Sequence, residues 1–407
     1  MSRVIYLDNN ATTMVDPEVV EAIRPYFTEQ YGNPSSMHTF GGQVGKAVVN
    51  ARERIAALIK ANPEEIIFTS CGTESDNTAI LSALLSSPEK RKVVTSRVEH
   101  PAVKSLCERL NQISGQKYRV TQLPVGRDGT MDLDRFEESL TEDTAIASIM
   151  WANNETGVLF PIEEMAAMAK GRGILFHTDA VQAVGKIPID VRKVPVDFLA
   201  ISGHKLHAPK GIGVLYVRKG TPFMPFMIGG HQEKGRRGGT ENVPSVVGLG
   251  KACELAAARM EEENTRVRYL RDKLENSLLA RIPNAILNGH KTLRLPNTTN
   301  ISFEYVEGES ILLHLDRHGI CASSGSACTS GSLEPSHVLR AMGVPFTAAH
   351  GSIRFSLSIF NTEEEIDYVL ERLPAIIGNL RDLSPFWKGA HQGRVGGASC
   401  CTRECEV

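Results

Sequence analysis

Short, unbroken apolar runs recur between residues 64 and 217, and they constrain the fold more than any other feature of the chain. They cover residues 66–68, 93–95, 119–123, 145–150, 174–177, 198–201 and 213–217. Strands that are apolar at successive positions are typical of a sheet covered on both faces. Segments with a helical pattern, such as 75–85 and 162–170, separate the runs. We therefore predict an α/β fold around a mainly parallel seven-stranded sheet, with helices on both faces.

The chain changes character on either side of this region. Residues 43–60 have the spacing of an amphipathic helix, and Pro17 after Asp16 indicates a helix start. A long charged helix is expected over 246–281, followed by short segments at 300–303, 310–318, 353–357 and 363–377. We predict a large domain over 15–260 and a smaller α+β domain from 1–14 and 261–384. The polar, Gly-rich residues 385–407 should form a flexible tail.

Composition excludes several classes of function. The net charge of −2 over 407 residues gives no reason to expect nucleic acid or an anionic membrane surface as a partner. No apolar stretch approaches the roughly 18 residues that span a bilayer, and the N-terminus is too polar for a signal peptide. Eight irregularly spaced cysteines indicate a reducing cytoplasm rather than a disulfide framework. Cys400, Cys401 and Cys405 match no metal-binding motif, so no metal site is predicted.

Lys205 and Asp179 follow two of the apolar runs. Lys205 closes the sequence Ser202-Gly203-His204-Lys205 after residues 198–201, and Asp179 follows residues 174–177. A lone lysine at a strand end is more often a solvated charge, but Asp179 between apolar segments needs a partner or a function. Pyridoxal phosphate requires an amine for its Schiff base and a carboxylate that keeps its ring nitrogen protonated. The pair therefore predicts pyridoxal phosphate chemistry.

A phosphate site can be predicted at the start of the helix that follows residues 66–69. Gly72 and Thr73 would offer free amides and a hydroxyl there. A plain helix cap is the alternative interpretation. Together with Ser202 and His204, these residues favour a cradle for the cofactor's phosphate.

Three further residues are candidates for contact with the cofactor or the substrate. His100 lies in a strand-to-helix loop, where it could stack on a flat cofactor and move protons, or have no role. Asn154 follows the run 145–150, where turn chemistry is the alternative. Arg354 lies in a strand-like run, and its fork suits an α-carboxylate unless it only covers a half-exposed strand face.

Two loops rich in small residues complete the set of candidates. The Ser/Gly-rich stretch 318–331 contains Cys328, in a setting that suits a nucleophile moving between a buried cofactor and an outside acceptor. Cys321, next to Ile320, fits the usual buried and inert cysteine. The Gly/Arg loop 229–242, which includes Thr240, suits an anion or a subunit contact.

These motifs occur in an order that resembles a known family over about residues 4–380. The segments that carry the resemblance are 6–13 (YLDNNATT), 31–36 (YGNPSS), 325–331 (GSACTSG) and 335–339 (PSHVL), together with the lysine and aspartate motifs. They resemble the cysteine desulfurases of the nitrogen-fixation (NifS/IscS-like) type, which are fold-type-I pyridoxal phosphate enzymes of the class V aminotransferase group. Ile359 departs from the pattern where a basic residue is expected, which puts only a surface contact in doubt.

The resemblance implies a role for each candidate residue. Lys205 would form the Schiff base, Asp179 would bind the ring nitrogen, Gln182 the ring oxygen, and His100 would stack and transfer protons. Gly72, Thr73, Ser202 and His204 would hold the phosphate, with Thr240 reaching in from the second subunit of a homodimer. Asn154 and Arg354 would orient L-cysteine, and Cys328 would take its sulfur as a persulfide, leaving L-alanine. The sulfur would then pass to an iron–sulfur scaffold protein.

Other functions share most of these residues. A selenocysteine lyase or another class V aminotransferase would use the same cofactor site, although an aminotransferase has no need of Cys328. A catalytically silent scaffold with this fold is disfavoured by the presence of Lys205, Asp179 and Cys328. The sequence does not identify the scaffold that takes the sulfur, nor does it separate a nitrogenase-dedicated role from a housekeeping one.

Overall fold

The computed structural model describes residues 4–113, 117–324, 335–385 and 387, and its centre is a seven-stranded sheet. The strands run in the order β2-β8-β7-β6-β5-β3-β4. Their bounds are β2 Ile66–Thr69, β3 Lys92–Ser96, β4 Arg119–Leu123, β5 Thr144–Ser148, β6 Leu175–Asp179, β7 Phe198–Ser202 and β8 Gly213–Val217. Each strand coincides with one of the apolar runs to within a few residues, and the predicted sheet is confirmed.

Strand direction decides which chain segments meet at the edge of this sheet. Neighbours from β7 through β6, β5 and β3 to β4 are all parallel. Strand β8 is antiparallel to both β7 and β2, so β2 points the same way as the parallel strands. The carboxyl ends of β2, β7, β6, β5 and β3 therefore lie along one edge, where α/β folds place their ligands.

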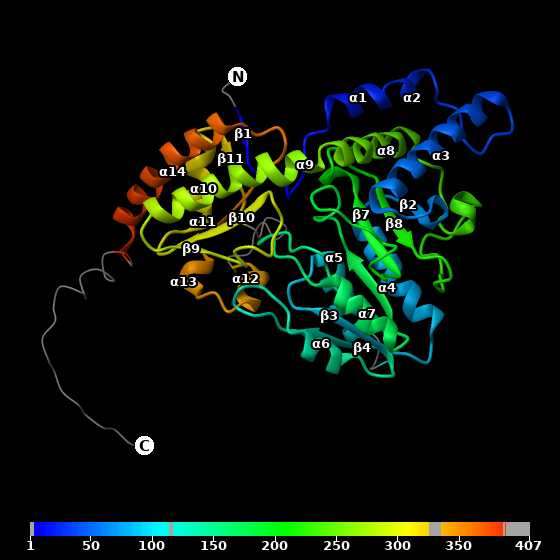
Figure 1. Cartoon of the computed structure of the whole chain (residues 1–407), viewed down its shortest axis with the longest axis horizontal. Coiled ribbons are helices and arrows are strands. Elements are labelled where there is room, and N and C mark those ends of the chain that lie inside the picture. Colours follow the sequence, from blue (N-terminus) through cyan, green and yellow to red (C-terminus); the bar gives the residue numbers. More distant parts are fainter. Residues whose placement is uncertain (1–3, 114–116, 325–334, 386, 388–407) are drawn as a thin grey trace, which may run out of the picture.

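Helices cover both faces of the sheet, as its apolar strands require (Figure 1). On β2, Ile66 and Phe68 belong to one core cluster and Ile67 to another, because successive side chains of a strand alternate between faces. Ile67 packs with the cluster that includes helix α4 (Gly72–Ser86), beside helix α5 (Pro101–Ile113). The opposite face carries α1 (Pro17–Ile23), α3 (Thr39–Ile59), α6 (Leu133–Ser139), α7 (Ile162–Gly171) and α8 (Val243–Ala258).

A second group of elements surrounds a core of its own (Figure 1). Strand β1 (Ile5–Tyr6) pairs in parallel with β11 (Ile320–Cys321), and β10 (Thr298–Phe303) lies antiparallel between β9 (Ala285–Leu287) and β12 (Ser352–Ser356). Helices α10 (Arg268–Arg281), α11 (Gly308–Arg317) and α14 (Glu363–Leu383) pack against these strands. Helix α12 (His337–Ala341) instead buries Val338 and Leu339 in the core of the large sheet. The domain boundaries proposed from the sequence stay a prediction.

The expectation of one continuous helix over 246–281 is wrong. Helix α8 ends before Arg259, whose backbone (φ −99°, ψ 8°) leaves the helical region. The guanidinium of Arg259 is held there by Asp16 (2.5 Å) and Glu18 (3.1 Å). Helix α9 (Met260–Glu262) and a π-helical turn (Glu263–Val267) then lead into α10. The hydrophobic periodicity persists through the break, so the sequence pattern alone does not reveal it.

The N-terminal segment links the two groups of elements. Asp8 forms a parallel bridge with Ser356 at the end of β12, and the main-chain amide of Thr13 donates to the carbonyl of His204 at 2.9 Å. Residues 8–13 therefore pass directly over the edge of the sheet that carries Lys205. Among the described residues, no helix has the length and apolar character needed to cross a membrane.

Candidate active site

Lys205 and Asp179 come together at the carboxyl edge of the sheet. Asp179 is the last residue of β6, and Lys205 closes the short 3-10 turn that follows the adjacent strand β7. Burial raises the pKa of the Asp179 carboxyl, while the charges of His100 and Lys205 oppose that rise. The structure thus places these three predicted residues within electrostatic reach of one another.

The amine of Lys205 is held by the main chain of the N-terminal segment. Its Nζ donates to the carbonyl of Asn10 and, at 2.7 Å, to that of Ala11. Gln182 Nε2 donates to the same Asn10 carbonyl at 3.0 Å. The oxygen of the same side-chain amide, Gln182 Oε1, is buried and has no hydrogen-bond partner in the part of the chain that the structure describes. The predicted lysine and glutamine therefore share one acceptor.

The predicted phosphate residues also meet at this edge. Gly72 begins helix α4, and a Cβ built there would lie 2.9 Å from Val181 Cγ2 and 3.4 Å from Ser202 Cβ. Only glycine lets the helix start approach Val181 and Ser202 this closely. Thr73, the next residue, is exposed. The N-terminus of α4 therefore lies against the end of β7, and the first amides of a helix have no acceptor within the helix.

His204, two residues after Ser202, is a neutral imidazole. Its Nδ1 lies 3.1 Å from Thr12 Oγ1. Burial, reinforced by the nearby positive charge of Lys205, lowers the pKa of His204 to about 4. A neutral imidazole can donate a hydrogen bond to an anion without adding a fixed charge.

His100 occupies the loop between β3 and α5. Burial lowers the pKa of its imidazole, and its Nδ1 accepts from the amide of Ala102 at 3.1 Å, so Nε2 carries the proton. The preceding Glu99 is fully buried, and its carboxyl accepts from Ser96 Oγ at 2.6 Å and from the Met150 amide. Burial raises the pKa of Glu99 to about 8, so a neutral acid anchors the loop that presents His100.

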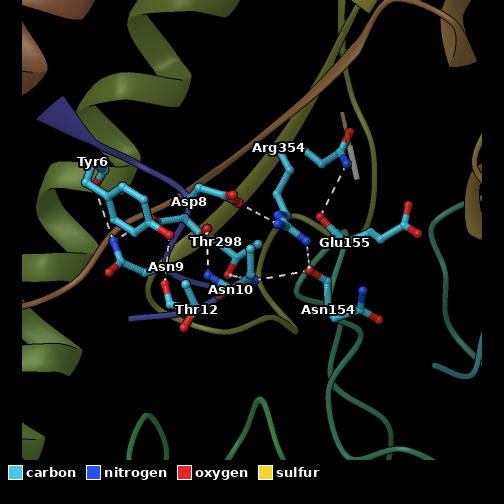
Figure 2. A network of polar contacts seen from close by, with 12 residues as sticks. Tyr6, Asp8, Asn9, Asn10, Thr12, Asn154, Glu155, Thr298 and Arg354 are labelled. Carbon is cyan, nitrogen blue, oxygen red and sulfur yellow. Dashed lines mark hydrogen bonds and ion pairs between the residues drawn. The ribbon is translucent and has the colours of Figure 1, made fainter. Parts of the chain in front are cut away.

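Arg354 is buried, which excludes the interpretation as a half-exposed strand residue. Its Nη2 forms an ion pair with Asp8 Oδ1 at 2.6 Å, and its Nη1 donates to the carbonyl of Asn154 at 3.0 Å (Figure 2). Arg354 Nε has no hydrogen-bond partner among the described residues. The two predicted residues are thus in contact through the main-chain carbonyl of Asn154, and the side-chain amide of Asn154 takes no part in this contact.

Cys328 lies outside the described residues. Thr240 is exposed and lines a cavity beside Thr69, Ser70 and Arg237, and no contact among the described residues joins it to Lys205. That Thr240 serves the cofactor site of another copy of the chain stays a prediction of the resemblance.

Cys321 is half-buried rather than fully buried. It pairs with Tyr6 in the two-stranded β1–β11 sheet. The expectation of a wholly buried position is wrong, because a sheet of two short strands covers its residues less than a large sheet does. Burial and the negative charges of Asp316 and Asp8 raise the pKa of its thiol. A thiol that resists ionisation is a poor nucleophile.

Sequence reasoning missed several residues of the site. Asp8 and Asn10 belong to the family motif at residues 6–13, but no role was predicted for them. Their position directly after the apolar run Ile5–Leu7 is the signal that could have indicated a site. The Glu155 carboxylate is buried and accepts from Ser336 Oγ, and burial raises the pKa of Glu155 to about 7. Asp76, on α4, lies 3.4 Å from His177 Nε2 on β6, two residues before Asp179.

The geometry fits pyridoxal phosphate on three counts. Within the described part of the chain, Gln182 Oε1 is a buried polar atom without a hydrogen-bond partner, and Gly72 lets the start of α4 lie close to Val181 and Ser202. Asp179 is a buried acid that gains from an added cation, and a protonated pyridine nitrogen is such a cation. The residues predicted from the sequence therefore offer polar groups and charges that suit this cofactor.

The comparisons with known proteins agree with this chemistry. The family model described as aminotransferase class-V matches residues 5–369. A cysteine desulfurase of Trichormus azollae is 63% identical over 383 residues, covering 94% of this chain and 95% of that protein. Cysteine desulfurase NifS of Azotobacter vinelandii is 60% identical over 386 residues, with 95% of each covered. A solved NifS-like protein superposes with a TM-score of 0.87 at 38% identity, covering 93% of this chain and all of that one.

Proposed function

We propose that Lys205 binds pyridoxal phosphate and that L-cysteine is desulfurated beside it. The chain belongs to the class-V aminotransferase family and is a cysteine desulfurase of the nitrogen-fixation type. One observation carries the assignment of residues. The Lys205 amine, the Asp179 carboxyl and the His100 imidazole interact electrostatically at the carboxyl edge of the sheet. The enzyme class predicted from the motifs is confirmed by the named relatives.

The cofactor would supply an electron sink for the bond-breaking steps at the α-carbon. Asp179 would keep positive charge on the ring nitrogen, since burial leaves its carboxylate in need of a cation. Gln182 Nε2, already oriented by Asn10, would donate its second hydrogen toward the ring oxygen. His100 would stack on the ring and move protons through Nε2, which its contact with Ala102 leaves protonated.

The phosphate would bind at the start of helix α4, beside the end of β7. Gly72 and Thr73 would present main-chain amides and a hydroxyl, with the helix dipole favouring the anion. Ser202 and the neutral His204 would add hydroxyl and imidazole donors.

L-cysteine would be held by its carboxylate. Arg354 is the cation that suits it, because its fork can bind two carboxylate oxygens and its Nε has no partner in the structure. Asn154 shares a contact with Arg354 and would flank the same group. Asp8 already forms an ion pair with Arg354 Nη2, so its carboxylate would compete with that of the substrate for this guanidinium.

The sulfur would pass to Cys328. Its thiolate would attack the substrate's sulfur, forming an S–S bond as the C–S bond breaks, and the carbon skeleton would take up a proton and leave as L-alanine. Cys321 is disfavoured as the acceptor because the pKa of its thiol is raised. The persulfide would then be passed to an iron–sulfur scaffold protein in the cytoplasm.

A homodimer would complete each site. Four large apolar side chains are exposed in one short stretch, namely Met224, Phe226, Met227 and Ile228. The Met227 carbonyl accepts from the Gly238 amide at 2.8 Å, so this stretch lies against the loop that leads to Thr240. An exposed apolar patch beside the residue that must reach another copy supports an interface there.

Alanine release from L-cysteine, with mass spectrometry for an added sulfur, tests the proposal. Cys328→Ala should bind the cofactor but lose alanine formation, whereas Cys321→Ala should remain active. Alanine formation by Cys328→Ala at the wild-type rate, or sulfur added at Cys321, would refute the assignment. Mixing Thr240→Ala with Lys205→Ala protein should restore some activity if sites are shared between subunits. A fully active monomer in sedimentation would contradict the dimer.

No observation favours the alternatives. The named relatives are cysteine desulfurases, and the described residues of the site offer no feature that selects selenium over sulfur or that calls for a keto acid. Selenocysteine lyase and other class V aminotransferase activities are therefore not proposed.

A further inference from the structure

Asn10 is buried and forms hydrogen bonds with both groups of elements. Its Nδ2 donates to the Asn154 carbonyl (3.2 Å) and to Thr298 Oγ1 (2.9 Å), and its Oδ1 accepts from Asn297 Nδ2 (3.2 Å). Its main-chain amide donates to Ser356 Oγ at 2.9 Å. Figure 2 shows the side chain between Thr298 and the Asn154 carbonyl. Every hydrogen-bonding group of this residue is thus engaged, and its position in the site is closely fixed.

The carbonyl of this fixed residue serves two proposed cofactor-binding side chains. It accepts from Lys205 Nζ and from Gln182 Nε2. A carbonyl oxygen accepts only from the NH2 side of an amide, so it sets which way the Gln182 amide faces. Carbonyl dipoles also favour the charged form of an amine, so Asn10 and Ala11 stabilise Lys205 as an ammonium.

We propose that Asn10 is a positioning residue: its side chain fixes the carbonyl that receives Lys205 when the lysine is not joined to the cofactor, and that orients Gln182. This rests on the proposed function, in which Lys205 gives up the cofactor when L-cysteine enters. The amine then needs a defined place from which it can return. The carbonyls of Asn10 and Ala11 are that place, 195 and 194 residues away in sequence from the lysine they hold.

Asn9 provides a matched control, because it is the same residue type, adjacent and equally buried. Its Nδ2 donates to the carbonyls of Tyr6 (3.2 Å) and Ser356 (3.0 Å), on the side of the small sheet. Asn9→Ala and Asn10→Ala both remove a buried amide and its hydrogen bonds. They differ in whether the carbonyl under Lys205 loses its support.

The test measures the reactivity of Lys205 in the full-length protein after the cofactor has been removed with hydroxylamine. Acetylation of Lys205 by acetic anhydride is followed by mass spectrometry across pH. Loosening the acceptors removes hydrogen bonds that favour the ammonium form, so Asn10→Ala should be acetylated roughly threefold to tenfold faster near pH 8. Asn9→Ala should stay within about twofold of wild type, because the acceptors keep their support. A circular dichroism spectrum like that of the wild type and a single cooperative thermal transition show that each variant is folded.

Equal labelling rates in Asn10→Ala and Asn9→Ala would overturn the proposal, since Asn10 would then only stabilise the fold. If Asn10→Ala does not fold, Thr298→Val decides, because it removes one acceptor of the Asn10 amide while keeping the shape of the side chain. It should shift labelling in the same direction, and a wild-type rate would count against the inference. Failure of the proposed function gives a different result: borohydride would fix the cofactor to a residue other than Lys205.

Discussion

Glu233 closes an ion pair that holds the loop leading to Thr240. Arg52 Nη1 and Nη2 donate to the two oxygens of Glu233 at 2.8 and 2.6 Å, and the Phe68 amide donates to Oε2 at 3.1 Å. Glu233 and Lys234 are both in the left-handed backbone region (φ 48° and 59°), which is costly for residues other than glycine. The loop keeps this conformation because the carboxylate is bound, so we expect Glu233→Gln to release it.

The size of the effect follows from the burial of the pair. The Glu233 side chain is 3% exposed and that of Arg52 is 18% exposed. Breaking a buried pair costs about 3–5 kcal/mol. The cost is nearer ~2–3 kcal/mol here because Arg52 keeps the Ile66 carbonyl and the face of the Phe68 ring. With an unfolding entropy of about 2.1 cal/mol/K per residue over 407 residues, this lowers the melting temperature by about 3 °C.

Thermal unfolding of the loaded enzyme and a titration of the cofactor-free enzyme with pyridoxal phosphate measure the two consequences. Affinity for the cofactor should fall about threefold or more, because Thr240 would no longer be held in place for the phosphate of the partner's site. Glu254→Gln is the control, since Glu254 pairs with Arg54 and Lys251 on the surface at 43% exposure and should shift melting by less than about 1 °C. If Glu233→Gln matches Glu254→Gln in both measurements, the loop is held by other contacts and the reasoning is wrong.

Three further predictions test the site directly. Lys205→Ala should lose covalent attachment of the cofactor, seen as no borohydride-fixed mass increase, and a reduced adduct on another lysine would contradict it. The pKa of Glu155 rises from 4.5 to about 7 on folding, so the folded state holds a proton that the unfolded state releases. Stability should therefore fall by ~3 kcal/mol as pH rises from about 4.5 to 7. In Glu155→Gln, the free energy of unfolding measured by chemical denaturation should no longer fall by this amount over that pH range. If its dependence on pH is unchanged, Glu155 does not contribute it. Asp8→Asn keeps an acceptor for Arg354 but removes the competing charge, so KM for L-cysteine should fall about twofold to fivefold; an unchanged KM would show that Asp8 does not compete.

The fold could be predicted from local pattern because its strands are local features. Each strand of the large sheet is an apolar run of a few residues, and burial on both faces leaves that mark directly in the sequence. The break at Arg259 left no such mark, since the contact that stabilises it is with Asp16, 243 residues away. Periodicity reports which face of a helix is buried and says little about where a distant ion pair bends the backbone.

The candidate site divides in the same way. Lys205, Asp179 and Gly72 could be located because each follows a strand, and parallel strands end at one edge. Asp8, Asn10 and Glu155 could not be assigned a role from the sequence, because their partners lie far along the chain. Arg354 is 346 residues from Asp8, and Ser336 is 181 residues from Glu155.

Three buried carboxyls lie near the site, and the sequence alone does not show which of them is best placed to be charged. Burial raises the pKa of Asp76, Glu99 and Asp179 alike. Asp76 faces His177, whose own pKa falls to about 3 because it is buried, so this neighbour supplies no positive charge. Glu99 accepts from a hydroxyl and an amide, which lower its pKa, but burial outweighs them and raises the pKa to about 8. Of the three, Asp179 is the one on which Lys205 and His100 act to lower the pKa, so it is the carboxyl best placed to be charged beside a cationic ring nitrogen.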